Sequence, residues 1–162
     1  MQEFDKDPRR QQELRCRPYA DRIYRQAFGE VKIHRDSDIV LDRDFAIDVR
    51  IKLPNGMNLL GQEKFLSKEY AKYNSVTVEY YQNQHTKELG DWFKIGVQIY
   101  FVGYENGNGF SPFILLDWTK VTIYSNQDKI KWHHNSNKNG SARASFAWVN
   151  MDDLNNCAIL RG

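Results

Sequence analysis

The most regular alternation of apolar and polar residues lies between positions 45 and 66. The first arm of this segment is apolar at every second position, which is the period of a strand with one buried face. Those positions are Phe45, Ile47, Val49, Ile51 and Leu53. The second arm, residues 57–66, is more continuously apolar and predicts a more buried strand. The pattern therefore predicts two neighbouring strands.

The residues Leu53-Pro54-Asn55-Gly56 predict the turn between these two strands. Proline suits the first turn position, asparagine tolerates the second, and glycine takes the left-handed position that follows. This combination is typical of a three-residue hairpin loop, a type I turn with a glycine bulge, which pairs Leu53 with Met57. A two-residue loop would instead pair Pro54 with Met57 and would require an N–H group that proline lacks.

This register brings three polar side chains to one face of the hairpin. It places Asp48 opposite Gln62. Lys64 shares their face because strand side chains repeat every second residue, whereas Glu63 points to the other face. A shift of one residue would replace Gln62 and Lys64 by Glu63. A carboxylate, an amide oxygen and an ammonium group are thus expected to form one patch.

The N-terminal region predicts two helical stretches. Asp7 followed by Pro8 is a favourable helix start, and the polar residues 9–17 continue it until Pro18 interrupts. The second stretch, residues 18–28, has an apolar stripe at helical spacing and stops at the glycine that follows. The stripe consists of Ala20, Ile23, Tyr24 and Ala27.

The rest of the chain mixes short strands and short helices. Residues 31–35 and 38–41 fit either strand or loop. Further strands are predicted at residues 75–81, 97–102 and 113–116, and a tail hairpin at residues 129–133 and 141–149. Loops are predicted at residues 82–90 and 104–109, and short helices at residues 67–73, after Asp91, after Asp117, and from Asp152 or Asp153. Without an internal repeat or a linker, residues 1–162 predict a single α+β domain.

Composition restricts the class of protein only loosely. The chain has 162 residues, 41% of them hydrophobic, which suffices for one domain with a proper core. A net charge of +2 permits nucleic-acid binding without requiring it. Cys16 and Cys157 lack any paired motif and are expected to be free thiols in a reducing cytosol. The polar N-terminus and the absence of long apolar runs predict a cytoplasmic protein that is neither secreted nor inserted into a membrane.

The order of these elements resembles the core of the PD-(D/E)XK nuclease superfamily. The similarity lies in a helix followed by a hairpin that carries Asp48 and then Gln62-x-Lys64. Some branches, including Mrr-like restriction enzymes, have glutamine in place of the first acid of the (D/E)-x-K element. The segments Thr77-Val78-Glu79-Tyr80, Gly90-Asp91-Trp92 and Ile99-Tyr100-Phe101-Val102 are also similar to later parts of nuclease-like phage and bacterial proteins. The resemblance covers residues from about 18 to 118, and it departs from the pattern in having no proline before Asp48.

The resemblance implies a DNA endonuclease that depends on Mg²⁺ or Mn²⁺. Its fold would be a mixed central sheet flanked by helices, a restriction-endonuclease-like core with residues 119–162 added as a C-terminal hairpin and helix. Enzymes of this type usually cut both strands of a duplex as dimers, so a homodimer or higher homo-oligomer is expected. The setting would be restriction, homing or a phage.

The chemistry of phosphodiester hydrolysis agrees with these residue types. A cation must offset the charge of the transition state and lower the pKa of a water, and Mg²⁺ prefers hard oxygen ligands. Asp48 would supply a charged ligand, Gln62 a neutral oxygen, and the backbone carbonyl that follows a third ligand. Lys64 would position the attacking water or stabilise the developing charge. Glu63 becomes a metal ligand only if the register shifts.

Three further acids are candidates for the same site. Glu79 lies on the polar face of its predicted strand and either joins the site or faces water. In several branches of the superfamily the first helix adds an acid, and Asp21 or Glu30 would match that position. Asp21 adjoins the apolar stripe, so a solvated helix edge is the competing interpretation.

The tail hairpin carries the basic residues expected to contact DNA. Arg143 has small neighbours that permit a backbone to approach closely, and it either binds a phosphate or is an ordinary exposed arginine. Lys131 and Lys138 in the same hairpin suit phosphate contacts. His133 and His134 are adjacent strand residues that face opposite ways, so they are not expected to share a metal.

Two other functional classes remain open from the sequence. One is a non-catalytic module that binds nucleic acid or protein and keeps the nuclease-like fold. The other is a structural phage protein or host-interaction protein without an enzymatic site. The position of Lys64 distinguishes them from an enzyme, because a catalytic site needs its ammonium group beside Asp48.

Overall fold

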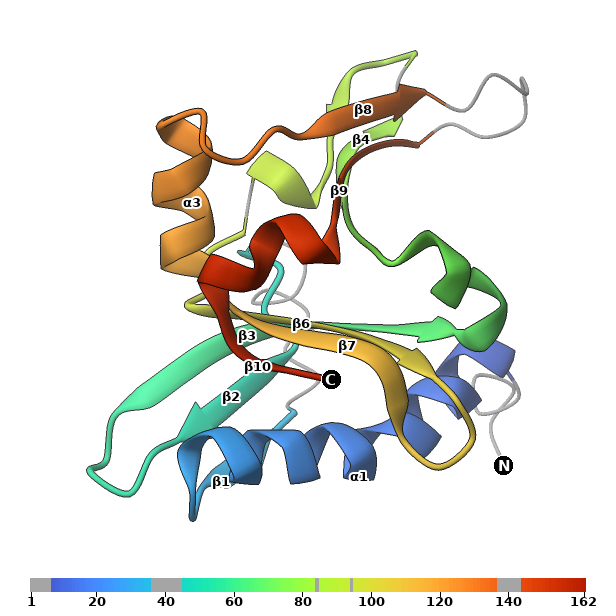
Figure 1. Ribbon diagram of the computed structural model, residues 1–162. Helices are drawn as coiled ribbons and strands as arrows, with labels where there is room; N and C mark the ends of the chain where they lie inside the picture. The colour runs from blue at the N-terminus through green and yellow to red at the C-terminus, as the bar shows by residue number, and fades with distance from the viewer. Residues whose placement is uncertain (1–6, 36–44, 84, 94, 137–143) are drawn as a thin grey trace.

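The computed structural model describes residues 7–35, 45–83, 85–93, 95–136 and 144–162. These residues form two sheets and a small number of helices, so the α+β class with a mixed central sheet is confirmed (Figure 1). The long helix α1 (Pro8–Phe28) lies below the central sheet, and the second sheet stands above it (Figure 1).

The central sheet has six strands in the order β1-β2-β3-β6-β7-β10. Strands β3 and β6 pair in parallel, and every other neighbouring pair is antiparallel. The strand bounds are Lys32–His34 for β1, Val49–Lys52 for β2, Asn58–Ser67 for β3, Ile99–Glu105 for β6, Phe110–Asp117 for β7 and Ala158–Arg161 for β10.

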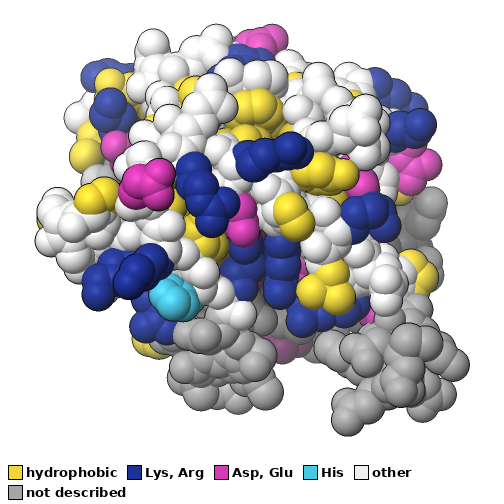
Figure 2. All heavy atoms as spheres, turned by 90° about the horizontal axis from the view of Figure 1, so that it is seen from below, with side chains coloured by type: hydrophobic (Ala, Val, Ile, Leu, Met, Phe, Trp, Pro, Cys, Tyr) yellow, Lys and Arg dark blue, Asp and Glu magenta, His cyan; other side chains and the backbone are white. Residues whose placement is uncertain are grey.

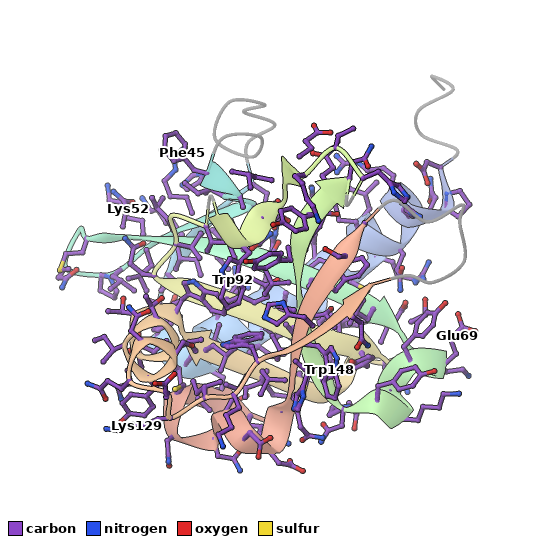
Figure 3. All side chains as sticks on the ribbon, turned by 90° about the horizontal axis from the view of Figure 1, so that it is seen from above. Phe45, Lys52, Glu69, Trp92, Lys129 and Trp148 are labelled. Atoms are coloured by element: carbon purple, nitrogen blue, oxygen red, sulfur yellow. The ribbon has the colours of Figure 1, made fainter. Side chains whose placement is uncertain are left out.

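The second sheet has four strands in the order β5-β4-β9-β8. Their bounds are Glu88–Leu89 for β5, Ser75–Asn83 for β4, Ser145–Asn150 for β9 and His133–Ser136 for β8. Seen from above, these strands run across those of the central sheet (Figure 3). The remaining elements are α3 (Trp118–Asn126) and the short 3-10 helices η2 (Lys68–Tyr73), η3 (Asp91–Phe93) and η4 (Met151–Cys157).

Each face of the central sheet has its own hydrophobic core. On the lower face, the predicted stripe of α1 packs against strands β2 and β6. The buried residues there include Ala20, Ile23, Tyr24, Val49, Ile51 and Phe101. On the upper face, the sheet packs against β4, β9, α3 and η4, through residues that include Val76, Val78, Tyr100, Val102, Leu116, Val121 and Leu154. The upper face is the one that also carries the polar residues of the hairpin.

Helix α1 differs from the sequence prediction because it continues through Pro18. Its start is as predicted, since Asp7 accepts a hydrogen bond from the Arg9 N–H group, and it ends at Gly29. The prediction of a break at Pro18 is wrong. Buried Cys16 and Ala20 hold the helix against the sheet on both sides of the proline, and this packing outweighs the lost backbone hydrogen bond.

Strand β2 is shorter than the alternation predicts. Ala46 has a positive φ of 52°, so the extended conformation begins only after it. Phe45, expected on the buried face, is 49% exposed, whereas Ala46 is buried. The strand starts at Val49, and Asp48 lies directly before it.

Several other boundaries are corrected by the structure. Part of the predicted loop 82–90 is strand, because β4 extends to Asn83 and β5 follows. β6 starts later than expected and includes Tyr104 and Glu105. The tail hairpin pairs as predicted, but β8 begins only at His133, and the terminal strand β10 was not predicted. Cys16 and Cys157 are free, as expected, and both are buried. Within the described ranges, no helix combines the length and the apolar character needed to span a membrane.

Candidate active site

The β2–β3 hairpin has the predicted register. Val49 pairs with Gly61, and the Leu53 N–H group donates to the Met57 carbonyl at 2.8 Å. The Gly56 N–H group closes the turn on the Leu53 carbonyl at 2.9 Å, and Gly56 has a φ of 86°. Only glycine adopts this conformation without a steric cost. The loop therefore fixes which residues of the hairpin point up and which point down.

Asp48 is held against β3 by two hydrogen bonds to the backbone of that strand. Its N–H group donates to the Gly61 carbonyl at 2.9 Å, and its Oδ2 accepts from the Glu63 N–H group at 2.8 Å. The carboxylate thus lies at the edge of β3 beside Gln62, as the register predicts. A carboxylate held in one orientation by a backbone N–H group is a suitable oxygen ligand for a hard cation.

Gln62 lies on the upper face of the central sheet and is only 9% exposed. It pairs in register with Tyr100 on the parallel strand β6. Its Nε2 donates to Asp91 Oδ2 at 3.2 Å, which sets the orientation of the amide. Its Oε1 is buried and, among the described residues, has no hydrogen-bond partner. A buried polar oxygen without a protein partner is unfavourable unless a water, an ion or another ligand satisfies it.

Lys64 lies two residues further along the same face. Its Nζ donates to both the backbone carbonyl and the hydroxyl of Thr77, each at 2.9 Å. Burial lowers the pKa of Lys64, while the negative charges of Asp91 and Glu79 act in the opposite direction. Glu79, which the sequence suggested as an additional acid of the site, is thus close enough to Lys64 for its charge to act on the ammonium group.

Asp91 and Tyr100 complete this cluster, and sequence reasoning assigned neither to the site. Burial raises the pKa of Tyr100, and the charges of Asp91 and Asp48 raise it further. Both carboxylates therefore act on the same phenol. The Tyr100 hydroxyl group donates to the Thr77 carbonyl at 3.4 Å, so it also lies close to the anchor of Lys64.

The glycine before Asp91 shows how this acid reaches the site. A Cβ atom on Gly90 would lie 2.6 Å from the Glu79 carbonyl oxygen, so only glycine permits this approach to β4. The Gly90 N–H group donates to the Tyr80 carbonyl at 2.9 Å. Asp91 was predicted only to cap a helix. The glycine directly before Asp91 in the sequence was the one signal for a close backbone contact at this point.

Glu63 lies on the opposite face, as the register predicts. Its carboxylate accepts hydrogen bonds from Tyr24 at 2.9 Å and from two nitrogens of Arg35 at 2.8 Å each. Arg35 also pairs with Asp21 at 2.7 Å. Burial alone would lower the pKa of Arg35, but Glu63 and Asp21 raise it overall. Glu63 and Asp21 thus belong to a buried ion-pair network below the sheet, away from Asp48.

The remaining candidates are dispersed. Glu30 is exposed at the end of α1, and Lys131 is exposed before β8. Arg143 and Lys138 lie outside the described residues. His133 and His134 have separate partners: His133 stacks on Trp148, and His134 contacts Tyr80 edge-on.

The donor set on the upper face consists of the carboxylates of Asp48 and Asp91 and the amide oxygen of Gln62. These are hard oxygen ligands of the kind that Mg²⁺ and Mn²⁺ take. No group of three or more His, Cys, Asp and Glu residues gathers around a potential metal position in the described part of the chain. The fit to a cation rests on two acids and on Gln62 Oε1, which lacks a hydrogen-bond partner in the described part of the chain.

Comparison with known proteins adds no family. No family model matches the chain, and no curated protein and no solved structure matches it either.

Proposed function

We propose that this protein is a metal-dependent nuclease that hydrolyses phosphodiester bonds in DNA. The observation that carries the proposal is the cluster on the upper face of the central sheet. Among the described residues, the buried Gln62 Oε1 has no hydrogen-bond partner, the Gln62 amide nitrogen contacts Asp91, and Asp48 is held beside Gln62. Lys64 lies on the same face of the strand.

The fold is compatible with a restriction-endonuclease-like core. The hairpin β2–β3 carries Asp48, Gln62 and Lys64, α1 covers the opposite face, and β6 adds in parallel to β3. This arrangement supports the proposal, since the resemblance predicts a mixed sheet with a helix on one side.

Each side chain of the cluster has a proposed role in catalysis. Asp48 and Asp91 would hold Mg²⁺ or Mn²⁺ together with Gln62 Oε1. The bound cation would offset negative charge on the reacting phosphate and lower the pKa of a water. Lys64 would orient that water or bind a phosphate oxygen. Burial lowers the pKa of Lys64, and the negative charges of Asp91 and Glu79 oppose that lowering in part.

The proposal extends to DNA as the substrate and to a homodimer for cutting both strands of a duplex. A single site cuts one phosphodiester bond at a time, so two sites related by symmetry would be needed for a double-strand break. The cytoplasm is the proposed compartment.

A cleavage assay tests this function. Purified protein is incubated with plasmid and with single-stranded DNA, in the presence of Mg²⁺, Mn²⁺ or a chelator. The wild type should cut only with a metal, and both Asp48→Ala and Lys64→Ala should abolish turnover. Glu30→Ala removes an exposed acid outside the cluster and should cut like the wild type.

Gln62→Glu is a more specific arm of the same assay. It adds a charge at the proposed cation position, so cleavage should persist or improve, with a changed preference between Mg²⁺ and Mn²⁺. If the folded wild type binds DNA but never cuts it with either metal, the alternative of a non-catalytic binding module replaces the nuclease.

A further inference from the structure

The 3-10 helix η2 presents two exposed aromatic rings. Tyr70 is 50% exposed and Tyr73 is 59% exposed, and their rings stack at 6.5 Å between centroids with an interplanar angle of 21°. Residues three apart lie above one another in a 3-10 helix, which explains the stack. The Nζ of Lys72 lies 5.2 Å from the centroid of the Tyr73 ring. The stacked pair therefore forms an exposed aromatic surface next to a positive charge.

A basic pocket adjoins the start of η2. It has a volume of about 530 Å³ and lies between the first turns of α1, the start of η2 and the β6–β7 turn. Arg9, Arg15 and Lys68 contribute its positive charges. Arg15 is paired with Glu105 at 2.7 Å, whereas no ion pair of Arg9 or Lys68 is found within the described residues. Two cations are thus available to an anionic ligand.

Lys68 connects the two features, because it is the first residue of η2 and also lines the pocket. At about 2 Å of rise per residue, the distance along η2 from Lys68 to Tyr73 is about 10 Å. This length suits a short run of nucleotides, with phosphates in the pocket and bases on the rings. On the underside of the molecule, Lys and Arg side chains are also more numerous than acidic ones (Figure 2).

The helix η2 is fixed relative to the candidate active site. It joins β3, which carries Gln62 and Lys64, to β4, which carries Thr77. At its end, the Met151 N–H group donates to the Asn74 carbonyl at 2.8 Å. Trp92 follows Asp91 of the candidate active site in the chain. In the view from above, Glu69 of η2 lies at the edge of the molecule, away from Trp92 (Figure 3). The aromatic surface is therefore anchored but open to solvent.

We infer that η2 and the adjoining pocket bind single-stranded nucleic acid. Unpaired bases would stack on Tyr70 and Tyr73, and Lys68 and Arg9 would contact phosphates. Aromatic surfaces interleaved with cations bind single strands with little sequence preference, because every base has a π-face. A duplex buries those faces between its own base pairs. This inference rests on the proposed nuclease function and specifies its substrate as DNA with an unpaired segment.

Fluorescence anisotropy tests the inference without cleavage. A labelled oligo(dT) of about 16 nucleotides is titrated with the protein in the presence of a chelator, so that no metal-dependent step occurs. Tyr70→Ala/Tyr73→Ala should bind at least about 30-fold more weakly than the wild type, because both stacking positions are lost. Tyr70→Phe/Tyr73→Phe keeps the rings and should bind like the wild type.

Two further variants separate stacking from charge and from general surface effects. Lys68→Ala should reduce the slope of log affinity against log salt by about 0.7, which corresponds to one phosphate contact with a single strand. Ile123→Ala removes a side chain that is 46% exposed on α3 and should leave binding unchanged. Circular dichroism of each variant verifies that it is folded.

Two results would overturn the inference: wild-type affinity in the Tyr70→Ala/Tyr73→Ala variant, or equal affinity for a duplex of the same length. Its failure differs from that of the nuclease proposal. A protein that cuts DNA but binds single strands independently of the two rings loses only this inference. A protein that needs the rings for binding but never cuts loses only the nuclease function.

Discussion

The environment of Lys64 differs from that of an ordinary surface lysine. Burial lowers its pKa, and its ammonium group is held by Thr77 with the charges of Glu79 and Asp91 nearby. Its hydrogen bonds hold the ammonium group in one position. Burial of the charged group destabilises the fold, whereas an exposed lysine would have no such cost. Such a cost is expected where a charge serves chemistry.

The cost predicts a pH dependence of stability. Below the lowered pKa of the native state, Lys64 is protonated in both states and its burial destabilises the fold. As pH rises through that value towards the ordinary lysine pKa of 10.5, the native side chain loses its proton first, and the wild type gains stability. Urea unfolding of the wild type and of Lys64→Met should therefore show a difference that shifts in favour of the wild type over this window. A difference that stays constant with pH would mean that burial does not perturb Lys64.

For individual residues, the sequence correctly predicted the side-chain positions that depend only on the register of the hairpin. The joint position of Asp48, Gln62 and Lys64, with Glu63 opposite, follows from the turn and from strand periodicity. Asp91 could not be placed in this way. It reaches Gln62 only because η3 folds back over the central sheet, and this is a tertiary contact that local pattern does not encode.

The hairpin is the element that determines this geometry. Its loop depends on Gly56, whose φ of 86° is disfavoured for any residue with a Cβ atom. Gly56→Ala should lower the free energy of unfolding by about 1 kcal/mol or more. The Cβ atom of the introduced alanine would meet no other atom within 4 Å, so the loss comes from backbone strain alone.

Gly109→Ala is the matched control, because that glycine also has open space but no left-handed φ. It should be neutral or slightly stabilising in the same thermal or urea unfolding experiment. Equal effects of the two substitutions would contradict the role assigned to the left-handed position.

Other elements show why sequence patterns gave incomplete boundaries. Pro18 predicted a break, but the packing of Cys16 and Ala20 keeps α1 continuous. The alternation from Phe45 predicted a longer strand, but the left-handed Ala46 ends the regular conformation. In both places the tertiary environment overrides a local preference that was interpreted correctly.

At the scale of the whole molecule, the central sheet separates two polar networks. Above it lies the candidate active site, and below it Arg35 connects α1, β1 and β3 through Asp21 and Glu63. The side chains of Arg35 and Glu63 are 9% and 6% exposed. The lower network contains two carboxylates and one cation, so Arg35 compensates both acids.

Removal of that cation should be strongly destabilising. Arg35→Met leaves Glu63 and Asp21 without their counter-charge, and breaking a buried pair in this way typically costs about 3–5 kcal/mol. The loss is measured by chemical denaturation, with Arg22→Ala on the exposed side of α1 as the control. If both variants lose a similar, small amount, the network does not fasten the helix to the sheet.

The arrangement of the two sheets was beyond the reach of sequence patterns. The strands themselves could be located, but the pairing of β4 with β9 brings together segments that are far apart in the chain. That pairing places Thr77 and Glu79 over Lys64. Periodicity identifies which residues share a face, whereas the contact between two faces depends on the packing of the entire chain.

We propose that Asp48, Gln62, Asp91 and Lys64 act together as one metal-dependent site. The most direct test is the rate of Mg²⁺-dependent DNA cleavage by the wild type and by Asp91→Asn, which keeps the shape of the side chain and removes its charge. We expect the wild type to cut, and the variant, still folded by circular dichroism, to lose at least about 100-fold in rate. A wild type that leaves DNA intact with either metal, or an Asp91→Asn variant that cuts at the wild-type rate, would contradict the claim.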